Sequence, residues 1–152
     1  MHPPPPPIKV FNPDLLTGQT ALVTGGGTGL GRVIAQQLAE AGADLVLAAR
    51  TVERLEQAAA EIRAATGRRV ETQFVNIRDR QTVEALAVWV QERVGTVDLL
   101  VNNAGGQFPQ PAIDFSIKGW NAVIDTNLNG TWYMMQRAAR LGPIFPSKGT
   151  GA

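Results

Sequence analysis

The sequence predicts an α/β fold in which helices cover both faces of a parallel, doubly wound sheet. Short apolar segments typical of buried strands occur at residues 20–24, 44–48, 70–75 and 97–101. Segments with helical periodicity alternate with them, at residues 30–41, 55–62, 83–94 and from Ser116 onward. This alternation is typical of right-handed strand–helix–strand units. We therefore expect about four parallel strands in the order 3-2-1-4, with the fourth strand as an apolar edge.

The composition is that of one globular domain, and it excludes several classes of function. Of the 152 residues, 44% are hydrophobic and 18% are charged, and a net charge of +1 gives no basic surface for nucleic acid or an anionic membrane. No apolar run approaches the roughly 18 residues that a membrane helix needs. The chain has no cysteine, and its one histidine, His2, lies beside a run of prolines. We therefore expect no metal site, and a reducing compartment, the cytoplasm, as the location.

The proline-rich amino terminus falls outside the expected domain. Pro3 to Pro7 favour polyproline II, which has no internal hydrogen bonds and packs poorly. We expect residues 1–12 to form a disordered leader, with a Pro-rich ligand for a partner protein as the alternative. The folded domain is expected to span residues 13–140. Residues 141–152 are expected to form a tail with no further strand or helix.

The loop between the first strand and the first helix indicates a dinucleotide site in a Rossmann-type fold. Gly25 permits a tight turn, Gly29 lets the backbone approach a pyrophosphate, and Gly31 lets the helix pack close to the strand. The helix then presents free N–H groups and its positive dipole end to the phosphates. A flexible turn is the alternative, and the absence of a following Lys-Ser/Thr pair argues against a triphosphate-binding P-loop. The residues expected to contact the cofactor here are Thr24, Gly25, Thr28, Gly29, Leu30 and Gly31.

Two motifs together resemble the short-chain dehydrogenase/reductase family. The loop has the spacing Thr-Gly-x-x-x-Gly-x-Gly, and the string Asn-Asn-Ala-Gly occupies residues 102–105, after the fourth strand. Asparagine side chains at such a position tie neighbouring strand ends together, and alanine and glycine leave room for a ribose. The resemblance implies that Asn103, Ala104 and Gly105 flank the ribose on the nicotinamide side. An ordinary turn rich in asparagine and glycine is the alternative.

The end of the second strand indicates which nicotinamide cofactor binds. NAD enzymes usually place an acidic residue there, which binds the 2′-hydroxyl of the adenine ribose. This sequence has Ala-Ala-Arg-Thr at residues 48–51 instead, and the planar charge of Arg50 suits a 2′-phosphate. The prediction is NADP(H), with a solvated arginine as the alternative. At the end of the third strand, Asn76 and Ile77 match the family positions that flank the adenine, although aspartate is commoner at the first.

Three local strings resemble a narrower group within the family. Residues 102–108, 118–120 and 127–134 are similar to peroxisomal trans-2-enoyl-CoA reductases and to 2,4-dienoyl-CoA reductases. The resemblance implies NADPH-dependent reduction of a carbon–carbon double bond in an acyl-CoA thioester, a reaction of fatty acid metabolism. Peroxisomal targeting is not implied, since the chain ends Thr-Gly-Ala rather than Ser-Lys-Leu.

The catalytic residues that the family resemblance implies are largely absent from the sequence. A serine and a Tyr-x-x-x-Lys motif are expected beyond residue 140 and do not occur; Ser147 and Lys148 lie in the tail. Tyr133 is expected to pack in a helix, and Ser116 to cap one. Asn127 alone matches a catalytic residue, the family asparagine that holds a water in the proton relay. We expect it to need a buried partner, because it shares a helical stripe with Trp120, Val123, Ile124 and Thr131.

Two interpretations of the chain follow. In the first, residues 13–140 are the NADP-binding part of a short-chain reductase, residues 141–152 are a non-family tail, and the truncated chain is inactive while its complete form is a homo-oligomer. In the second, the chain is a non-catalytic NADP-binding or dimerisation module whose fourth helix pairs with a second subunit. Both interpretations place the cofactor at the same loops.

Overall fold

The structure is a computed structural model that describes residues 11–142, so most of the proline-rich leader and the residues Ser147 and Lys148 lie outside the described residues. The secondary structure alternates strands with helices as the sequence predicts. In chain order the elements are β1 (Thr20–Thr24), α1 (Gly29–Glu40), β2 (Asp44–Ala49), α2 (Val52–Thr66), β3 (Val70–Phe74), α3 (Arg80–Arg93), β4 (Leu99–Val101), the 3₁₀ turn η1 (Ala112–Asp114), α4 (Ile117–Ile124), the π-helical turn η2 (Asp125–Gly130) and α5 (Thr131–Leu141).

The four described strands form one parallel sheet in the order β3-β2-β1-β4, which confirms the predicted order. The fourth strand is shorter than the predicted residues 97–101. Its ladder begins at Leu99, because the side chain of Asp98 accepts a hydrogen bond from the Thr20 N–H at 2.8 Å. The N–H of Val97 donates instead to the carbonyl of Leu141, at 3.1 Å. Val97 therefore attaches the end of α5, and Asp98 attaches the start of β1.

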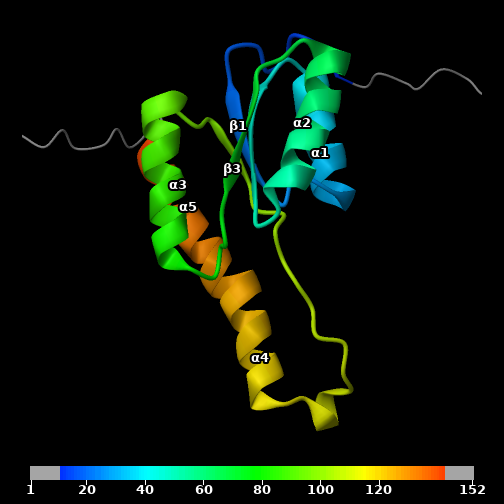
Figure 1. The fold of residues 1–152 in the computed structure, drawn as a ribbon, viewed down its shortest axis with the longest axis vertical. Helices are drawn as coiled ribbons and strands as arrows, with labels where there is room; N and C mark the ends of the chain where they lie inside the picture. Colours follow the sequence, from blue (N-terminus) through cyan, green and yellow to red (C-terminus); the bar gives the residue numbers. More distant parts are fainter. Residues whose placement is uncertain (1–10, 143–152) are drawn as a thin grey trace, which may run out of the picture.

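Helices cover both faces of the sheet, with α1 and α2 on one side and α3 and α5 on the other (Figure 1). Alternate residues of each inner strand enter the two cores. In β1, Ala21 and Val23 pack with α1 and α2, whereas Leu22 packs with α3 and α5. This two-sided burial explains why β1 and β2 are apolar without interruption, as in other parallel sheets.

The fourth helical segment is a single rod with a wide turn in its middle (Figure 1). Helices α4 and α5 are joined by η2, so the expectation of one regular helix is wrong. A π turn holds an extra residue, which rotates everything after it by about 100° relative to the α-helical pattern. The predicted apolar stripe is only partly covered: Trp120, in α4 before the wide turn, is 56% exposed, whereas Val123, Ile124 and Thr131 are half-buried.

Helix ends follow the predicted signals. The Ser116 hydroxyl accepts a hydrogen bond from the Gly119 N–H at 3.0 Å, which confirms Ser116 as the cap of α4. Gly67 ends α2 in the left-handed region, with φ of 68°. That conformation favours glycine, because other residues meet their own carbonyl oxygen there.

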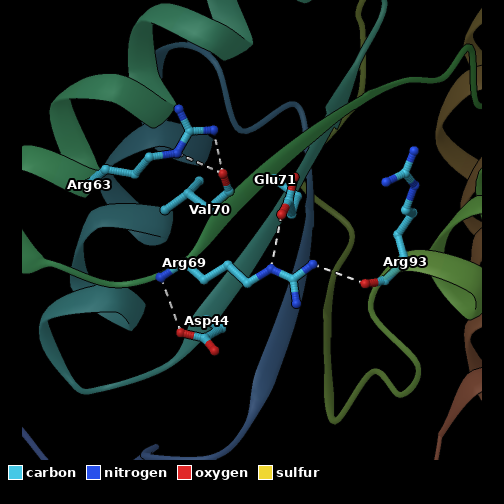
Figure 2. A network of polar contacts seen from close by, with 6 residues as sticks. All are labelled: Asp44, Arg63, Arg69, Val70, Glu71 and Arg93. Carbon is cyan, nitrogen blue, oxygen red and sulfur yellow. Dashed lines mark hydrogen bonds and ion pairs between the residues drawn. The ribbon is translucent and has the colours of Figure 1, made fainter.

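Polar side chains hold the edge strand β3 at the amino end of the sheet (Figure 2). The Arg63 Nε donates to the carbonyl of Val70 at 2.9 Å. The Arg69 guanidinium donates to Glu71 and to the carbonyl of Arg93, each at 2.9 Å, and so joins β3 to the end of α3. Val70 is the one fully buried residue of β3. The strand therefore has little contact with the hydrophobic core, and these hydrogen bonds add to its attachment. At the opposite, carboxyl end of the sheet, the strands are followed by loops.

Candidate cofactor-binding site

The loops after the strands surround a cavity of about 460 Å³ at the carboxyl edge of the sheet. In open α/β sheets, ligands bind in the crevice outside this edge. The lining comes from the glycine loop, from the loops after β2, β3 and β4, and from one side of α4 and η2. The lining residues are Gly25, Gly27, Thr28, Ala49, Arg50, Thr51, Arg54, Val75, Asn76, Ile77, Arg78, Asn103, Ala104, Gly105, Gly106, Gln107, Phe108, Ala122, Val123 and Thr126.

The glycine loop packs as tightly as the sequence predicts. Gly25 has φ of 69°, and Gly29 has φ of 53° with no neighbouring atom within 4 Å of the place where a side chain would begin. At Gly31 the same place is already filled by the Gly25 carbonyl and the Asn103 side chain. Gly31 therefore allows α1 to approach β1, and Gly29 leaves the loop open on its outer side.

The turn after β4 is fixed to the end of β1 by Thr24 and Asn103. The Thr24 side chain is buried, and its hydroxyl accepts hydrogen bonds from the backbone N–H groups of Asn103 and Ala104 at 3.1 and 3.0 Å. It donates in turn to the carbonyl of Val101 at 3.2 Å. The Asn103 amide donates to the Thr24 carbonyl at 3.0 Å. Asn103 thus joins the two strand ends, as its position predicts.

The structure brings most of the predicted cofactor residues together, but not all of them line the cavity. The residues at its wall are Gly25, Thr28, Arg50, Asn76, Ile77, Asn103, Ala104 and Gly105. Thr24 and Gly31 lie behind the wall, where they support its shape. Leu30 is 77% exposed, one residue into α1. Gly29 has open space around it but is not part of the lining.

Arg50 lies at the rim of the cavity, exposed, directly after β2. Two further arginines that the sequence analysis did not single out line the same cavity: Arg54, in the first turn of α2, and Arg78, directly after Asn76 and Ile77. Arg54 follows Arg50 at a spacing of about one helical turn, and this spacing could have indicated that the two side chains lie on the same side of the chain. The lining contains no aspartate or glutamate among the described residues.

Asn127 is exposed rather than buried, so the expected buried environment is wrong. Its side-chain amide is nevertheless fully engaged. The Nδ2 group donates to the Gly106 carbonyl at 2.6 Å and to the Val123 carbonyl at 3.0 Å, and Oδ1 accepts from the Gly106 N–H at 3.1 Å. The π turn places Asn127 on the side that faces the loop after β4. Its side chain therefore holds the segment that carries Gly105 and Gly106 against α4.

The far wall of the cavity carries apolar side chains together with Gln107 and Thr126. Phe108 lies over Gly119, where an added Cβ would be 3.0 Å from the Phe108 ring, and it makes an edge-to-face contact with Phe115 at 5.9 Å between ring centroids. Ala122 and Val123 of α4 complete this wall. The cavity therefore carries arginines at the loops after β2 and β3, and a mixture of apolar and polar side chains at the loop after β4 and at α4.

Tyr133 does not reach the cavity. Its ring packs on the core beneath α3 and α5, and the Arg80 guanidinium lies 5.9 Å from the ring centroid. Four residues later, Arg137 makes an ion pair with Glu84 at 2.6 Å. These contacts agree with the expectation that Tyr133 packs in the helix.

A doubly wound parallel sheet with a glycine turn at its carboxyl edge defines the chain as a Rossmann-type dinucleotide-binding protein. It belongs to the short chain dehydrogenase family, whose model matches residues 19–150. The match takes in residues 141–150, which the sequence pattern alone set outside the domain. This is a family of oxidoreductases that use nicotinamide dinucleotides.

Individual relatives support the same placement. The chain is 37% identical to the peroxisomal 2,4-dienoyl-CoA reductase of Danio rerio, over 81% of this chain and 41% of the relative. The citronellol catabolism dehydrogenase of Pseudomonas aeruginosa has a similar structure, with a TM-score of 0.81 and 39% identity over 88% of this chain and 54% of that protein. An alcohol dehydrogenase from Thermococcus sibiricus, complexed with 5-hydroxy-NADP, has a TM-score of 0.78 and 32% identity over 81% of this chain and 52% of that protein.

The chain spans about half the length of the relatives it matches, or somewhat less. The matched half is the one that carries the glycine loop and the turn after β4. Among the helices of residues 11–142, none combines the length and apolar character that a bilayer crossing requires.

Proposed function

We propose that this chain binds NADP(H). The observation that supports this proposal most directly is the positive charge of Arg50 at the end of β2. Arg50 stands where a carboxylate would bind an unmodified ribose, and no carboxylate lines the cavity among the described residues. A fixed, planar guanidinium binds phosphate oxygens through paired hydrogen bonds. The structural relative complexed with an NADP derivative is in keeping with this preference.

The remaining residues of the cavity suit the other parts of a dinucleotide. Gly25 and Thr28, at the amino end of α1, would hold the pyrophosphate, since the first N–H groups of a helix have no partner within the helix. Asn76 and Ile77 would flank the adenine. Asn103, Ala104 and Gly105 would flank the ribose on the nicotinamide side. When bound, the cofactor would supply the hydride, and these residues would hold the cofactor in position.

We further propose that the whole enzyme reduces the carbon–carbon double bond of an enoyl-CoA type substrate. The support is the similarity to a dienoyl-CoA reductase and the apolar side chains of Phe108, Ala122 and Val123 at the far wall of the cavity. These side chains would contact an acyl chain favourably, because such contacts remove apolar surface from water. The dehydrogenases among its structural relatives make an alcohol or ketone the competing substrate class.

The test of the cofactor proposal is a titration with NADPH and with NADH. Replacing Arg50 by alanine is expected to weaken NADPH binding by about 1.5–3 kcal/mol, the usual cost of losing a charge-assisted hydrogen bond, and to leave NADH binding nearly unchanged. Isothermal calorimetry measures both. An equal loss for the two cofactors would show that Arg50 does not contact the 2′-phosphate.

A second candidate function is a non-catalytic NADP-binding or dimerisation module. The observation that favours it is a row of exposed apolar side chains on the rod, whose α4 end projects beyond the sheet (Figure 1). The row consists of Ile117, Trp120, Leu128, Trp132 and Met135. Exposed apolar patches of this kind mark interaction surfaces. Sedimentation of a Trp132→Gln variant separates the two functions, since a module that pairs through this row would lose its self-association, whereas association through the β4 edge would be unchanged.

A further inference from the structure

The cavity ends where one aromatic side chain of the loop after β4 meets the helix α4. Along one side of this helix and of η2, the lining residues are Ala122, Val123 and Thr126. Gly119 lies on the same side one turn earlier, but it is buried and is not part of the lining. The ring of Phe108 covers it, since a Cβ added at Gly119 would lie 3.0 and 3.2 Å from two carbons of this ring. The ring therefore forms the end wall of the cavity at α4.

Several contacts hold the Phe108 ring in this place. Its face rests on Gly119, and Phe115 meets it edge to face, with 5.9 Å between the ring centroids. Two residues earlier, both the N–H and the carbonyl of Gly106 are hydrogen-bonded to the Asn127 side chain. Phe108 is nevertheless 46% exposed, so its ring can change rotamer without opening the hydrophobic core. The end wall is thus positioned but can be displaced.

The side chains next to the Phe108 ring suit a hydrocarbon. Ala122 and Val123 present only methyl groups, and the Thr126 hydroxyl donates its proton to the Ala122 carbonyl at 2.8 Å. The other polar side chain of this wall, Gln107, is exposed, where water can solvate it. A carbon chain placed here would remove apolar surface from water without leaving the Thr126 hydroxyl proton unpaired.

The position of Phe108 in the chain places it on the substrate side of the proposed cofactor. It follows three residues after Gly105, which is proposed to flank the ribose next to the nicotinamide. A substrate that exchanges hydride with the nicotinamide must lie beside it. In an enoyl-CoA thioester the nucleotide lies on one side of the double bond and the hydrocarbon chain on the other. The hydrocarbon chain is the part that fits the wall formed by Phe108, Ala122 and Val123.

We propose that Phe108 is a specificity-determining residue that limits the length of the hydrocarbon chain in the substrate, and that Gly119 is the positioning residue on which its ring rests. This inference rests on the proposed function, because the chain in question is that of an enoyl-CoA type substrate. A chain that just reaches the ring gains contact with it. A longer chain must move the ring away from Gly119 and Phe115, so its additional methylene groups add no affinity.

The experiment measures binding of saturated acyl-CoA thioesters, from butyryl-CoA to decanoyl-CoA, by calorimetry with NADP⁺ present. Free coenzyme A is the reference without a chain. Each methylene group that is buried should lower the Kd about threefold to fourfold, until the chain meets the ring and the Kd reaches a plateau. In Phe108→Ala the plateau should move to longer chains. This variant should bind decanoyl-CoA about tenfold more tightly than the unsubstituted chain, as burial of two more methylene groups would give.

Phe74→Ala is the matched control. Phe74 is 44% exposed, nearly the same as Phe108, and it lies outside the cavity lining. Its replacement removes the same side chain and should leave the plateau at the same chain length. Phe108→Leu should retain a plateau, because leucine keeps most of the apolar bulk at the end wall. Melting temperatures of the variants show that each is folded.

Gly119→Ala tests the contact between the helix and the ring. Alanine favours a helix more than glycine does, but its Cβ would press on the Phe108 ring. The next neighbour, the Ser116 hydroxyl at 3.2 Å, is the same whether or not Phe108 is present. Gly119→Ala should therefore raise the melting temperature more in the Phe108→Ala chain than in the unsubstituted chain. It should also shift the plateau only where Phe108 is present.

The proposal is overturned if the affinity for thioesters rises without a plateau up to decanoyl-CoA, or if Phe108→Ala leaves the plateau in place. It is also overturned if Phe74→Ala moves the plateau as far, or if Gly119→Ala has equal effects in both backgrounds. Straight-chain alcohols from butanol to decanol separate this inference from the proposed substrate class. A plateau that depends on Phe108 for alcohols but not for thioesters would keep the role of the ring and refute the enoyl-CoA proposal. If neither series has a plateau, this inference fails, and the proposed NADP(H) binding is judged by its own titration.

Discussion

At the scale of single residues, small side chains in the glycine loop and the turn after β4 set the shape of the cavity. Gly31 is buried because the Gly25 carbonyl and the Asn103 side chain fill the space that a Cβ would need. Thr24 hydrogen-bonds the backbone of the turn after β4 and lies behind the wall. Residues that the family motif associates with the cofactor thus include some that shape the cavity only through their neighbours.

Replacing Gly31 by alanine is expected to lower the free energy of unfolding by about 1–3 kcal/mol, the usual cost of overpacking. Alanine favours helix more than glycine does, by about 1 kcal/mol, but the collision involves a backbone carbonyl that cannot move without opening the Gly25 turn. Urea denaturation measures the change.

Gly106→Ala is the control for this substitution. A Cβ at Gly106 would have one neighbour, the Thr126 methyl group at 4.0 Å, and the expected change is within about 0.5 kcal/mol. A Gly31 variant as stable as this control would show that α1 tolerates displacement from β1.

At the scale of elements, the π turn η2 decides what the fourth helical segment does. Asn127 lies within this turn, and its side chain hydrogen-bonds the loop after β4 at Gly106. Gly130, the last residue of η2, lies close to the loop after β3, since an added Cβ would be 2.9 Å from the Ile77 carbonyl oxygen. The wide turn therefore contacts two loops that line the cavity. π turns inside α-helices frequently occur at functional sites.

Asn127→Ala is expected to release the segment around Gly106. Both the N–H and the carbonyl of Gly106 lose a partner, so its amide should exchange with solvent faster, and stability should fall by about 0.5–1.5 kcal/mol per lost bond. Hydrogen exchange followed by NMR measures the first effect.

The control for this experiment is Asn129→Ala, on the same turn. The Asn129 amide donates to the Asp125 carboxylate at 3.0 Å and to no loop of the cavity. It should leave the Gly106 amide unchanged. Equal exchange rates in the two variants would mean that Asn127 does not hold the loop.

At the scale of the whole molecule, β4 is an edge of the described sheet, and its three residues are only half-buried. An unpaired apolar edge is a template for pairing with another chain. We expect the purified 152-residue chain to self-associate or aggregate, and sedimentation velocity over a range of concentrations measures this. A monomer that melts in one sharp transition at every concentration would contradict the prediction.

Binding and turnover are expected to separate in this chain. The glycine loop, Arg50 and the turn after β4 are all present, so the 152-residue chain should bind NADPH. Its sequence contains no serine with Tyr-x-x-x-Lys, and loss of a positioned acid alone costs about 10²–10⁴ in rate. We expect no detectable NADPH oxidation with enoyl-CoA or ketone substrates. Turnover near the rate of a full-length relative would require another acid.

The sequence by itself determined the fold class, the strand order, the glycine loop and the position of Arg50 at the end of β2. These features follow from local signals: the periodicity of apolar residues, the glycines and the strand ends, which share one edge in a parallel sheet. Local patterns encode such features because the spacing of apolar residues along a strand or helix reflects which of its sides is buried, irrespective of the segment that packs there.

Only the tertiary structure decided the π turn, the exposed position of Asn127 and the presence of Arg54 and Arg78 in the same cavity lining as Arg50. The wide turn departs from the 3.6-residue period that the sequence pattern assumes, and its Asn127 contact with Gly106 spans 21 residues of sequence. The three arginines line one cavity because β2 and β3 are neighbours and their loops emerge at one edge. Contacts between distant segments depend on how the layers pack, which no single window of sequence contains.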